Sequence, residues 1–282
     1  MCPEAIYTIF SAEGRRNELH FAIDLAQRLE VPLALLLQRP SDAEHEVFRN
    51  AMRREAESGR KRSRNREDGL LSLDLDAEIE KRIRESVSAS AKNIPTARYE
   101  TIPADPARFA YPPGVLVVSN EIAKQRGDLW MIAPFDEHAV AERGEGEIMI
   151  PLGNGESGQY AVTESLAFVK RLGFGIVFWH TTWKNPSVDS TDPQHHVCTM
   201  AGEVLRDAEF QADRLGVRHR SIIETAPDVV EGLLRRALLE QCVMIIMARG
   251  QHTGRGRYVD RLLARPSPIP VLVVGKSTEV SA

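Results

Sequence analysis

The chain is poor in cysteine and has no long apolar run. Its 282 residues include three cysteines, Cys2, Cys198 and Cys242, and their spacing does not suggest disulfide pairs. A disulfide framework is therefore not expected, and the sparse thiols suit a reducing compartment. The longest strongly apolar stretch, residues 31–37, is far shorter than the about 20 residues that a membrane-spanning helix needs. We therefore expect no membrane insertion.

The sequence also lacks a strong charge of either sign and a recognisable leader. The first residues, Met1 to Glu4, have no basic patch and no apolar core, so a cytoplasmic location is expected. A net charge of −4 gives no general reason to expect nucleic acid as a partner. With 43% hydrophobic and 27% charged residues, the composition is typical of a globular protein, and the length suffices for two domains.

One basic segment, near residues 53–68, departs from this mild acidity. Between Arg53 and Arg66, seven arginines and lysines stand against two glutamates, with no aromatic residue among them. Such a block either contacts nucleic acid or a membrane surface, or forms a solvated loop. We favour the solvated loop, because short charge blocks are often disordered.

The two halves of the chain repeat one order of elements, and we divide them into domains at 1–143 and 144–282. The segment LAQRLEVPLALLL at 25–37 aligns with AFVKRLGFGIVFW at 167–179. Each half opens with a strand, an amphipathic helix and a second buried strand. In the second half, apolar strands are expected near residues 147–152, 174–180, 217–223, 243–248 and 270–274, with helices between them. This alternation predicts two tandem Rossmann-like α/β domains, each with a parallel sheet covered on both faces.

The first half is predicted to lack its fifth strand. The segment GDLWMIA at 127–133 matches CVMIIMA at 242–248 and is interpreted as the fourth strand. The residues that follow, 134–146, contain no apolar run. The fourth strand would then be an exposed edge, which proteins usually cover or pair. Either the second domain or a second copy of the chain would cover it.

A glycine-rich loop follows the strand at 243–248 and precedes a short helix, Tyr258 to Arg265, and a last apolar run, PIPVLVV at 268–274. Backbone amides of such a loop, together with the N-terminus of the next helix, can hold a phosphate. This order, the RLG-then-strand junction at 171–180, and the ARG-x-x-x-G turn at 248–254 resemble the universal stress protein family.

The resemblance implies a five-stranded fold of the adenine-nucleotide-hydrolase type, tandem duplication, and dimers formed through the last strand. It also implies a homodimer or a protein partner, and roles that are regulatory more often than catalytic. Some members of the family bind ATP, so ATP or AMP is the candidate ligand.

Three features mark the ATP-binding members, and the sequence departs from each. Gly153 stands where an acidic residue ends the first strand. Gly250 and Gly254 are spaced one residue wider than Gly-x-x-Gly, and Arg257 and Tyr258 replace a Gly-Ser or Gly-Thr pair. Losing the small pair removes a close backbone approach and a hydroxyl donor.

Nearby arginines could partly substitute as charge-assisted phosphate ligands. The candidate nucleotide-binding residues are Gly153, Met247, Ala248, Arg249, Gly250, Gly254, Arg255, Gly256, Arg257 and Tyr258. In the first half, MIAPFDEH stands at the matching place without a glycine, so no nucleotide is expected there.

Two other groups of residues have both a functional and a structural interpretation. His195 and His196 lie near Cys198, but no second pair of metal ligands is visible, so we interpret them as the start of a helix rather than a metal site. Trp179 and His180 follow the second strand of their domain and either line a crevice at the strand ends, together with Trp183, or pack in the core.

No nucleophile–base pair or catalytic motif is present, and none of the residues is assigned a catalytic role. The sequence therefore predicts a non-enzymatic regulatory or interaction protein of the universal stress type, with weak or no nucleotide binding. The alternatives are an ATP or adenylate sensor that uses residues 250–258 and a weak nucleotide-dependent hydrolase.

Overall fold

The computed structural model describes residues 2–10, 16–38, 97–102, 105–119, 122–123, 130–133, 146–153, 156–182, 193–249, 258–265 and 267–275. The basic segment near 53–68 and the predicted boundary between residues 143 and 144 lie outside these ranges. Among the described ranges, no helix is both long enough and apolar enough to cross a bilayer.

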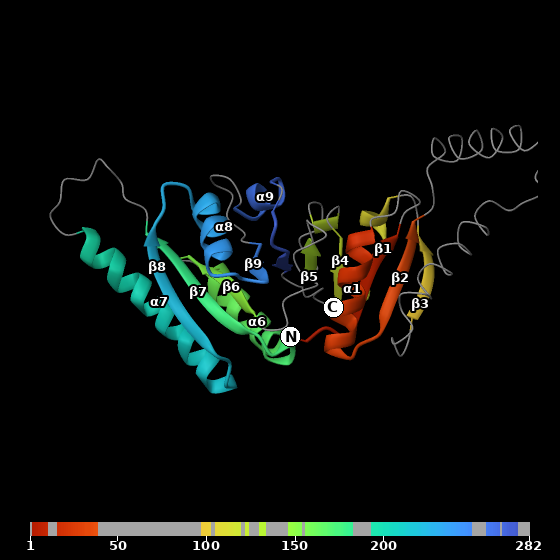
Figure 1. Cartoon of the computed structure of the whole chain (residues 1–282), viewed down its shortest axis with the longest axis horizontal. Helices are drawn as coiled ribbons and strands as arrows, with labels where there is room; N and C mark the ends of the chain where they lie inside the picture. The colour runs from red at the N-terminus through yellow and green to blue at the C-terminus, as the bar shows by residue number, and fades with distance from the viewer. Residues whose placement is uncertain are drawn as a thin grey trace, which may run out of the picture.

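Ten strands form one continuous sheet in the order β3-β2-β1-β4-β5-β10-β9-β6-β7-β8 (Figure 1). The first half supplies β1 (Ala5–Phe10), α1 (Arg16–Leu29), β2 (Leu33–Gln38), β3 (Ala97–Ile102), the short helix η2 (Pro106–Arg108), β4 (Val115–Val118) and β5 (Trp130–Ala133). The second half supplies β6 (Glu147–Leu152), α6 (Glu156–Leu172), β7 (Gly175–Thr182), α7 (Pro193–Leu215), β8 (His219–Thr225), α8 (Val229–Leu239), β9 (Met244–Ala248), α9 (Tyr258–Leu263) and β10 (Val271–Val274).

The predicted fold class is confirmed, since both halves have the same order of parallel strands and helices alternate with the strands in the second half. All five strands predicted in the second half are present. Every pair of neighbouring strands is parallel except β5 and β10, which run antiparallel where the two halves meet. The segment WMIA is therefore covered within the chain, by β10.

The prediction that the first half lacks its fifth strand is wrong. Each half has five strands in the order third, second, first, fourth, fifth, and WMIA is the fifth strand of its half, β5. The fourth strand is the short run VLVV, β4, which lies between β1 and β5. Buried apolar strands carry no mark of their place in the order, so matching WMIA to MIIMA shifted the assignment by one strand.

The connection between the fourth and fifth strands differs between the halves. In the first half it covers residues 119–129, and in the second half it covers residues 249–270. The longer connection contains the predicted glycine loop and α9. The connection in the first half is therefore shorter, by sequence length, than the one that contains the predicted loop.

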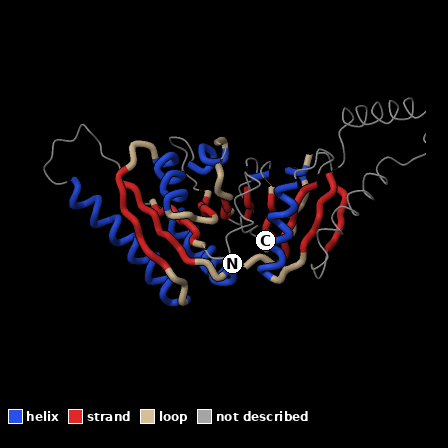
Figure 2. Tube along the Cα trace, viewed as in Figure 1, coloured by secondary structure: helices blue, strands red, loops and turns tan. Residues whose placement is uncertain are grey.

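Helices cover both faces of the sheet (Figure 2). On one face, α1, α6 and α7 pack in a single apolar cluster that spans both halves. On the other face, α8 and α9 pack in a second cluster with Ile122 and Ala123 of the first half. The core is thus continuous across the β5–β10 joint on both faces.

Candidate functional site

The candidate site lies at the carboxyl ends of β6 and β9, which are neighbours in the sheet. Gly153 directly follows β6, as predicted, and a Cβ added there would meet no atom within 4 Å. The open space means that packing does not require glycine at this position. A Cβ on Gly158, in the first turn of α6, would lie 3.3 Å from the Gly153 nitrogen, so the helix begins close against the end of β6.

Arg249 follows β9 and is used to join the two halves. Its side chain is only 12% exposed and lies 3.2 Å from the Asp260 carboxylate of α9. The same guanidinium group donates a 2.9 Å hydrogen bond to the carbonyl of Ala123, in the first half. This arginine is the candidate phosphate ligand nearest to β9, and its Nη2 atom contacts protein groups, whereas its Nε atom has no hydrogen-bond partner.

The rest of the predicted nucleotide site is only partly described. Met247 and Ala248 end β9 and are half-buried, while Tyr258 begins α9 and is 48% exposed. Gly250, Gly254, Arg255, Gly256 and Arg257 lie outside the described residues. The described part therefore brings Gly153, the end of β9 and the start of α9 to one edge of the sheet, and the glycine loop itself stays a prediction.

Two contacts at this edge have no counterpart in the sequence analysis. Tyr160 of α6 donates a 3.1 Å hydrogen bond to the carbonyl of Gly275, which holds the end of β10 against the helix. Arg261 of α9 pairs with Asp228, the N-cap of α8. Hydrogen bonds from Glu231, together with this arginine, lower the pKa of the Asp228 carboxyl. Local spacing cannot indicate such contacts, because their partners are far apart in the chain.

Trp179 and His180 pack in the core, so the packing interpretation holds for both. Trp179 is 1% exposed and His180 is 2% exposed. The Nδ1 atom of His180 lies 2.8 Å from the carbonyl of Leu152, at the end of β6. Burial lowers the pKa of this imidazole, and the hydrogen bond with Leu152 opposes that effect. Trp183 lies outside the described residues.

His195, His196 and Cys198 lie in the first turns of α7, which begins at Pro193. The helix start predicted there is confirmed, and the orientation of these side chains lies outside the described part of the structure.

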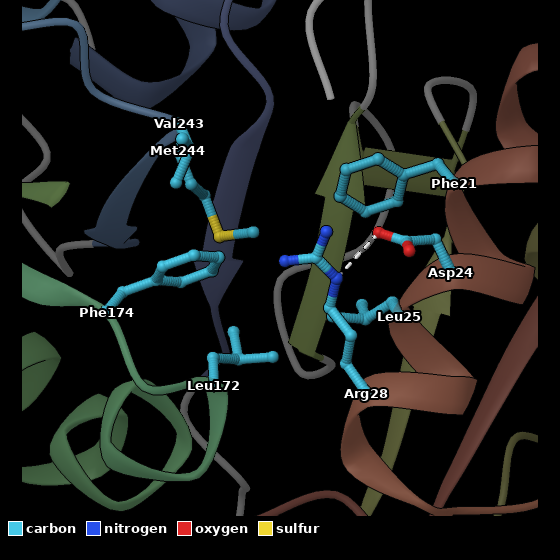
Figure 3. A pocket seen from close by; sticks show the side chains of 8 residues that line it. All are labelled: Phe21, Asp24, Leu25, Arg28, Leu172, Phe174, Val243 and Met244. Carbon is cyan, nitrogen blue, oxygen red and sulfur yellow. Dashed lines mark ion pairs between the residues drawn. The ribbon is translucent and has the colours of Figure 1, made fainter. Parts of the chain in front are cut away.

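A narrow crevice separates the halves on the face covered by α1 and α6 (Figure 3). Its walls are largely apolar, with Leu25 on one side and Phe174 and Met244 on the other. Arg28 pairs with Asp24 at 3.0 Å, and its guanidinium carbon lies 5.8 Å from the centre of the Phe174 ring. This cation–π contact connects α1 to the second half.

No protein-family model matches the sequence, and no curated protein matches it. Solved structures do match the fold over almost the whole chain. A putative universal stress protein from Pseudomonas aeruginosa UCBPP-PA14 aligns over 98% of this chain and 94% of its own, with a TM-score of 0.57 and 10% identity. A universal stress protein from Archaeoglobus fulgidus DSM 4304 aligns over 97% of both chains, with a TM-score of 0.54 and 11% identity.

A functionally unknown protein from Pseudomonas aeruginosa PAO1 is similar to the same extent, covering 98% of this chain and 93% of its own with a TM-score of 0.54 and 11% identity. At such identities the likeness concerns the fold. It extends over both halves, which agrees with the resemblance seen in the sequence. The chain therefore has the universal stress protein fold, present twice and joined in a single sheet.

Proposed function

We propose that this chain is a non-catalytic regulatory or interaction protein of the universal stress type, acting in the cytoplasm, that binds adenine nucleotide weakly or not at all. The observation that carries the proposal is the position of Arg249. Its guanidinium group is engaged by Asp260 and by the carbonyl of Ala123, and it is largely buried. Both contacts are made by one atom, Nη2, and the contact with Ala123 joins the two halves; charge-assisted hydrogen bonds of this kind are worth about 1.5–3 kcal/mol each.

The edge of the sheet supports the same proposal. Gly153 provides no side chain to recognise a base or ribose, and Tyr258 stands where a small residue would let the backbone approach a phosphate. A ligand that binds here would therefore rely on the predicted loop alone.

The pairing of β5 with β10 also limits where a partner can bind. The resemblance implies that relatives dimerise through the last strand, and in this chain the outer edge of β10 already pairs with β5. We infer that any homodimer or protein partner binds elsewhere on the molecule.

Thermal unfolding in the presence of millimolar ATP or AMP tests the proposal. A ligand that binds only the native state stabilises it, by about 2.7 kcal/mol at a hundredfold excess over Kd. We expect no shift of Tm with either nucleotide, and no phosphate release above a protein-free blank.

A G153D variant is the matched comparison, because the open space at Gly153 accepts a side chain. We expect no nucleotide-dependent shift in this variant either, since the loop departs from the family pattern independently. A rise in Tm of the natural chain with ATP would favour the sensor, and phosphate release would favour the hydrolase.

A further inference from the structure

Unpartnered polar atoms are concentrated beneath α8. Among the described residues, five buried side-chain nitrogen or oxygen atoms lack a hydrogen-bond partner. One of them is Arg249 Nε. The other four are Trp179 Nε1, Thr181 Oγ1, Glu224 Oε1 and Arg236 Nε, all from the strand pair β7–β8 and the helix that covers it. We call this layer the α8 seam.

The topology places the four groups on one face. Trp179 and Thr181 are alternate residues of β7 and so point to the same side of the sheet. Thr181 is the register partner of Glu224 on β8. Helix α8 lies over them, since a Cβ added to Gly232 would come 3.5 Å from the Trp179 ring.

Electrostatic contacts in the seam are too long to be direct hydrogen bonds. The two carboxylate oxygens of Glu224 lie 4.0 Å from nitrogen atoms of Arg235 and Arg236, respectively. A hydrogen bond between nitrogen and oxygen spans about 2.7–3.2 Å. Polar groups separated by more than about 3.5 Å are commonly bridged by water.

Leaving these groups without partners would be costly. An unsatisfied buried donor or acceptor costs about 1–3 kcal/mol, and a charged one costs more. Trp179 is 1% exposed, so its indole N–H has no access to bulk solvent. The side chains of Glu224 and Arg236 are partly exposed, at 18% and 30%, and a small molecule bound in the seam would satisfy these groups in place.

The donor and acceptor set defines that molecule. The indole and the guanidinium Nε only donate, the Glu224 carboxylate only accepts, and the Thr181 hydroxyl does both. An anion would leave the Glu224 carboxylate without a donor, and a cation would leave both N–H donors without an acceptor. A neutral molecule that donates and accepts fits all four groups.

We propose that the α8 seam is a binding site for internal water, which bridges Trp179 and Thr181 of β7 to Glu224 and Arg236. Such water is part of a folded structure and is costly to remove. The bridging water would connect α8 to the edge of the sheet through polar contacts, whereas the buried face of the helix packs through apolar contacts.

A crystal structure of the full chain at a resolution that shows ordered solvent tests the proposal. We expect a solvent peak within about 3.2 Å of Trp179 Nε1, also in contact with Thr181 or Glu224. In a T181V variant we expect that peak to be lost or displaced, and in T181S we expect it to be retained. T182V is the matched control, because the neighbouring Thr182 hydroxyl lies 3.2 Å from Thr225 and outside the seam.

A second measurement needs no crystal. NMR on the natural chain detects cross-relaxation between water and the Trp179 indole proton. A W179F variant assigns the signal among the three tryptophans of the sequence. Direct protein–protein hydrogen bonds without a solvent peak would overturn the proposal, as would a bound solute other than water. A signal or peak unchanged in T181V, or equally lost in T182V, would also overturn it.

Discussion

Arg249 joins the two halves of the chain at the edge where a phosphate ligand was predicted. Its place after β9 is where a phosphate ligand is expected, but its contacts run to α9 and to the first half. The contact with Ala123 spans 126 positions in the sequence. Local spacing could identify Arg249 as a candidate but could not reveal this use.

Replacing Arg249 by alanine is expected to destabilise the whole chain. The substitution leaves the Ala123 carbonyl and the Asp260 carboxylate without this guanidinium group, and we expect a loss of about 1–3 kcal/mol in the free energy of unfolding. Urea denaturation measures this loss in the free energy of unfolding. The exposed Arg265 provides the control, and R265A should change stability by less than about 0.5 kcal/mol. Equal effects of the two substitutions would contradict the proposed joint.

His180 makes stability depend on pH. Its folded-state pKa lies below the ordinary value of 6.5, because burial disfavours the charged ring. The stabilisation is therefore fully present above pH 6.5 and is lost as the pH falls through the folded-state pKa, by up to about 1.4 kcal/mol per pH unit.

An H180N variant keeps a side-chain N–H that can donate to Leu152 and removes the titration. We expect its stability to decline less steeply than that of the natural chain between pH 6.5 and 5, as measured by urea denaturation at each pH. If H180N kept the slope of the natural chain, His180 would not be the responsible group.

At the scale of elements, α8 combines a well-marked start with close packing. Asp228 caps the helix by accepting hydrogen bonds from the backbone of Val230 and Glu231. Inside the helix, Gly232 faces the sheet. A Cβ there would lie 2.6 Å from the Cβ of Ala226, which is closer than real contacts allow.

Two glycine substitutions in helices should therefore have opposite effects. Alanine is favoured over glycine by about 1 kcal/mol inside a helix. In G202A, on α7, the added methyl meets nothing within 4 Å, and we expect Tm to rise. In G232A the clash with Ala226 should dominate and lower stability by about 1–3 kcal/mol. Thermal unfolding of both variants checks this, and a stabilised G232A would show that α8 does not pack as described.

The elements that could be predicted from the sequence are those with continuous apolar character. The strands β6, β7, β9 and β10 and the apolar face of α8 are of this kind, whereas β8, HRSIIET, is a polar edge strand that the alternation of elements predicted. In the first half, neither β3, the polar edge strand ARYETI, nor β4, the short run VLVV, is predicted. Because β3 pairs with a neighbour on one side only, burial imposes little pattern on it. Counting WMIA as the fourth strand leaves one strand between it and β2 where the structure has two, and this created the apparent loss of a fifth strand.

The candidate site was predictable only in outline. The end of β6 at Gly153 and the end of β9 at Ala248 lie together because parallel strands that are neighbours end at one edge. The packing of Trp179 and the hydrogen bond of His180 to Leu152 depend on contacts between strands, which sequence periodicity does not determine.

At the scale of the whole molecule, the antiparallel joint of β5 and β10 makes two five-stranded sheets into one. Leu272 lies opposite Ile132, and Val273 lies opposite Met131. All four side chains are fully buried, with Ile132 and Leu272 in the cluster on one face and Met131 and Val273 in the cluster on the other. The resemblance assigns dimerisation to the edge of the last strand, β10. In this chain that edge is already paired with β5 of the same molecule, and we therefore place any partner elsewhere.

Cross-linking across this joint tests it most directly. In a chain with its three natural cysteines replaced by serine, M131C and V273C would be directly opposed, at a Cα separation of about 4.5–5.5 Å that a disulfide can span. The M131C/L272C pair is the control, because its side chains point to opposite faces. We predict an oxidised, intramolecular cross-link in M131C/V273C alone, seen on a non-reducing gel. A failure to cross-link, or a cross-link only between separate chains, would contradict a single sheet built from both halves.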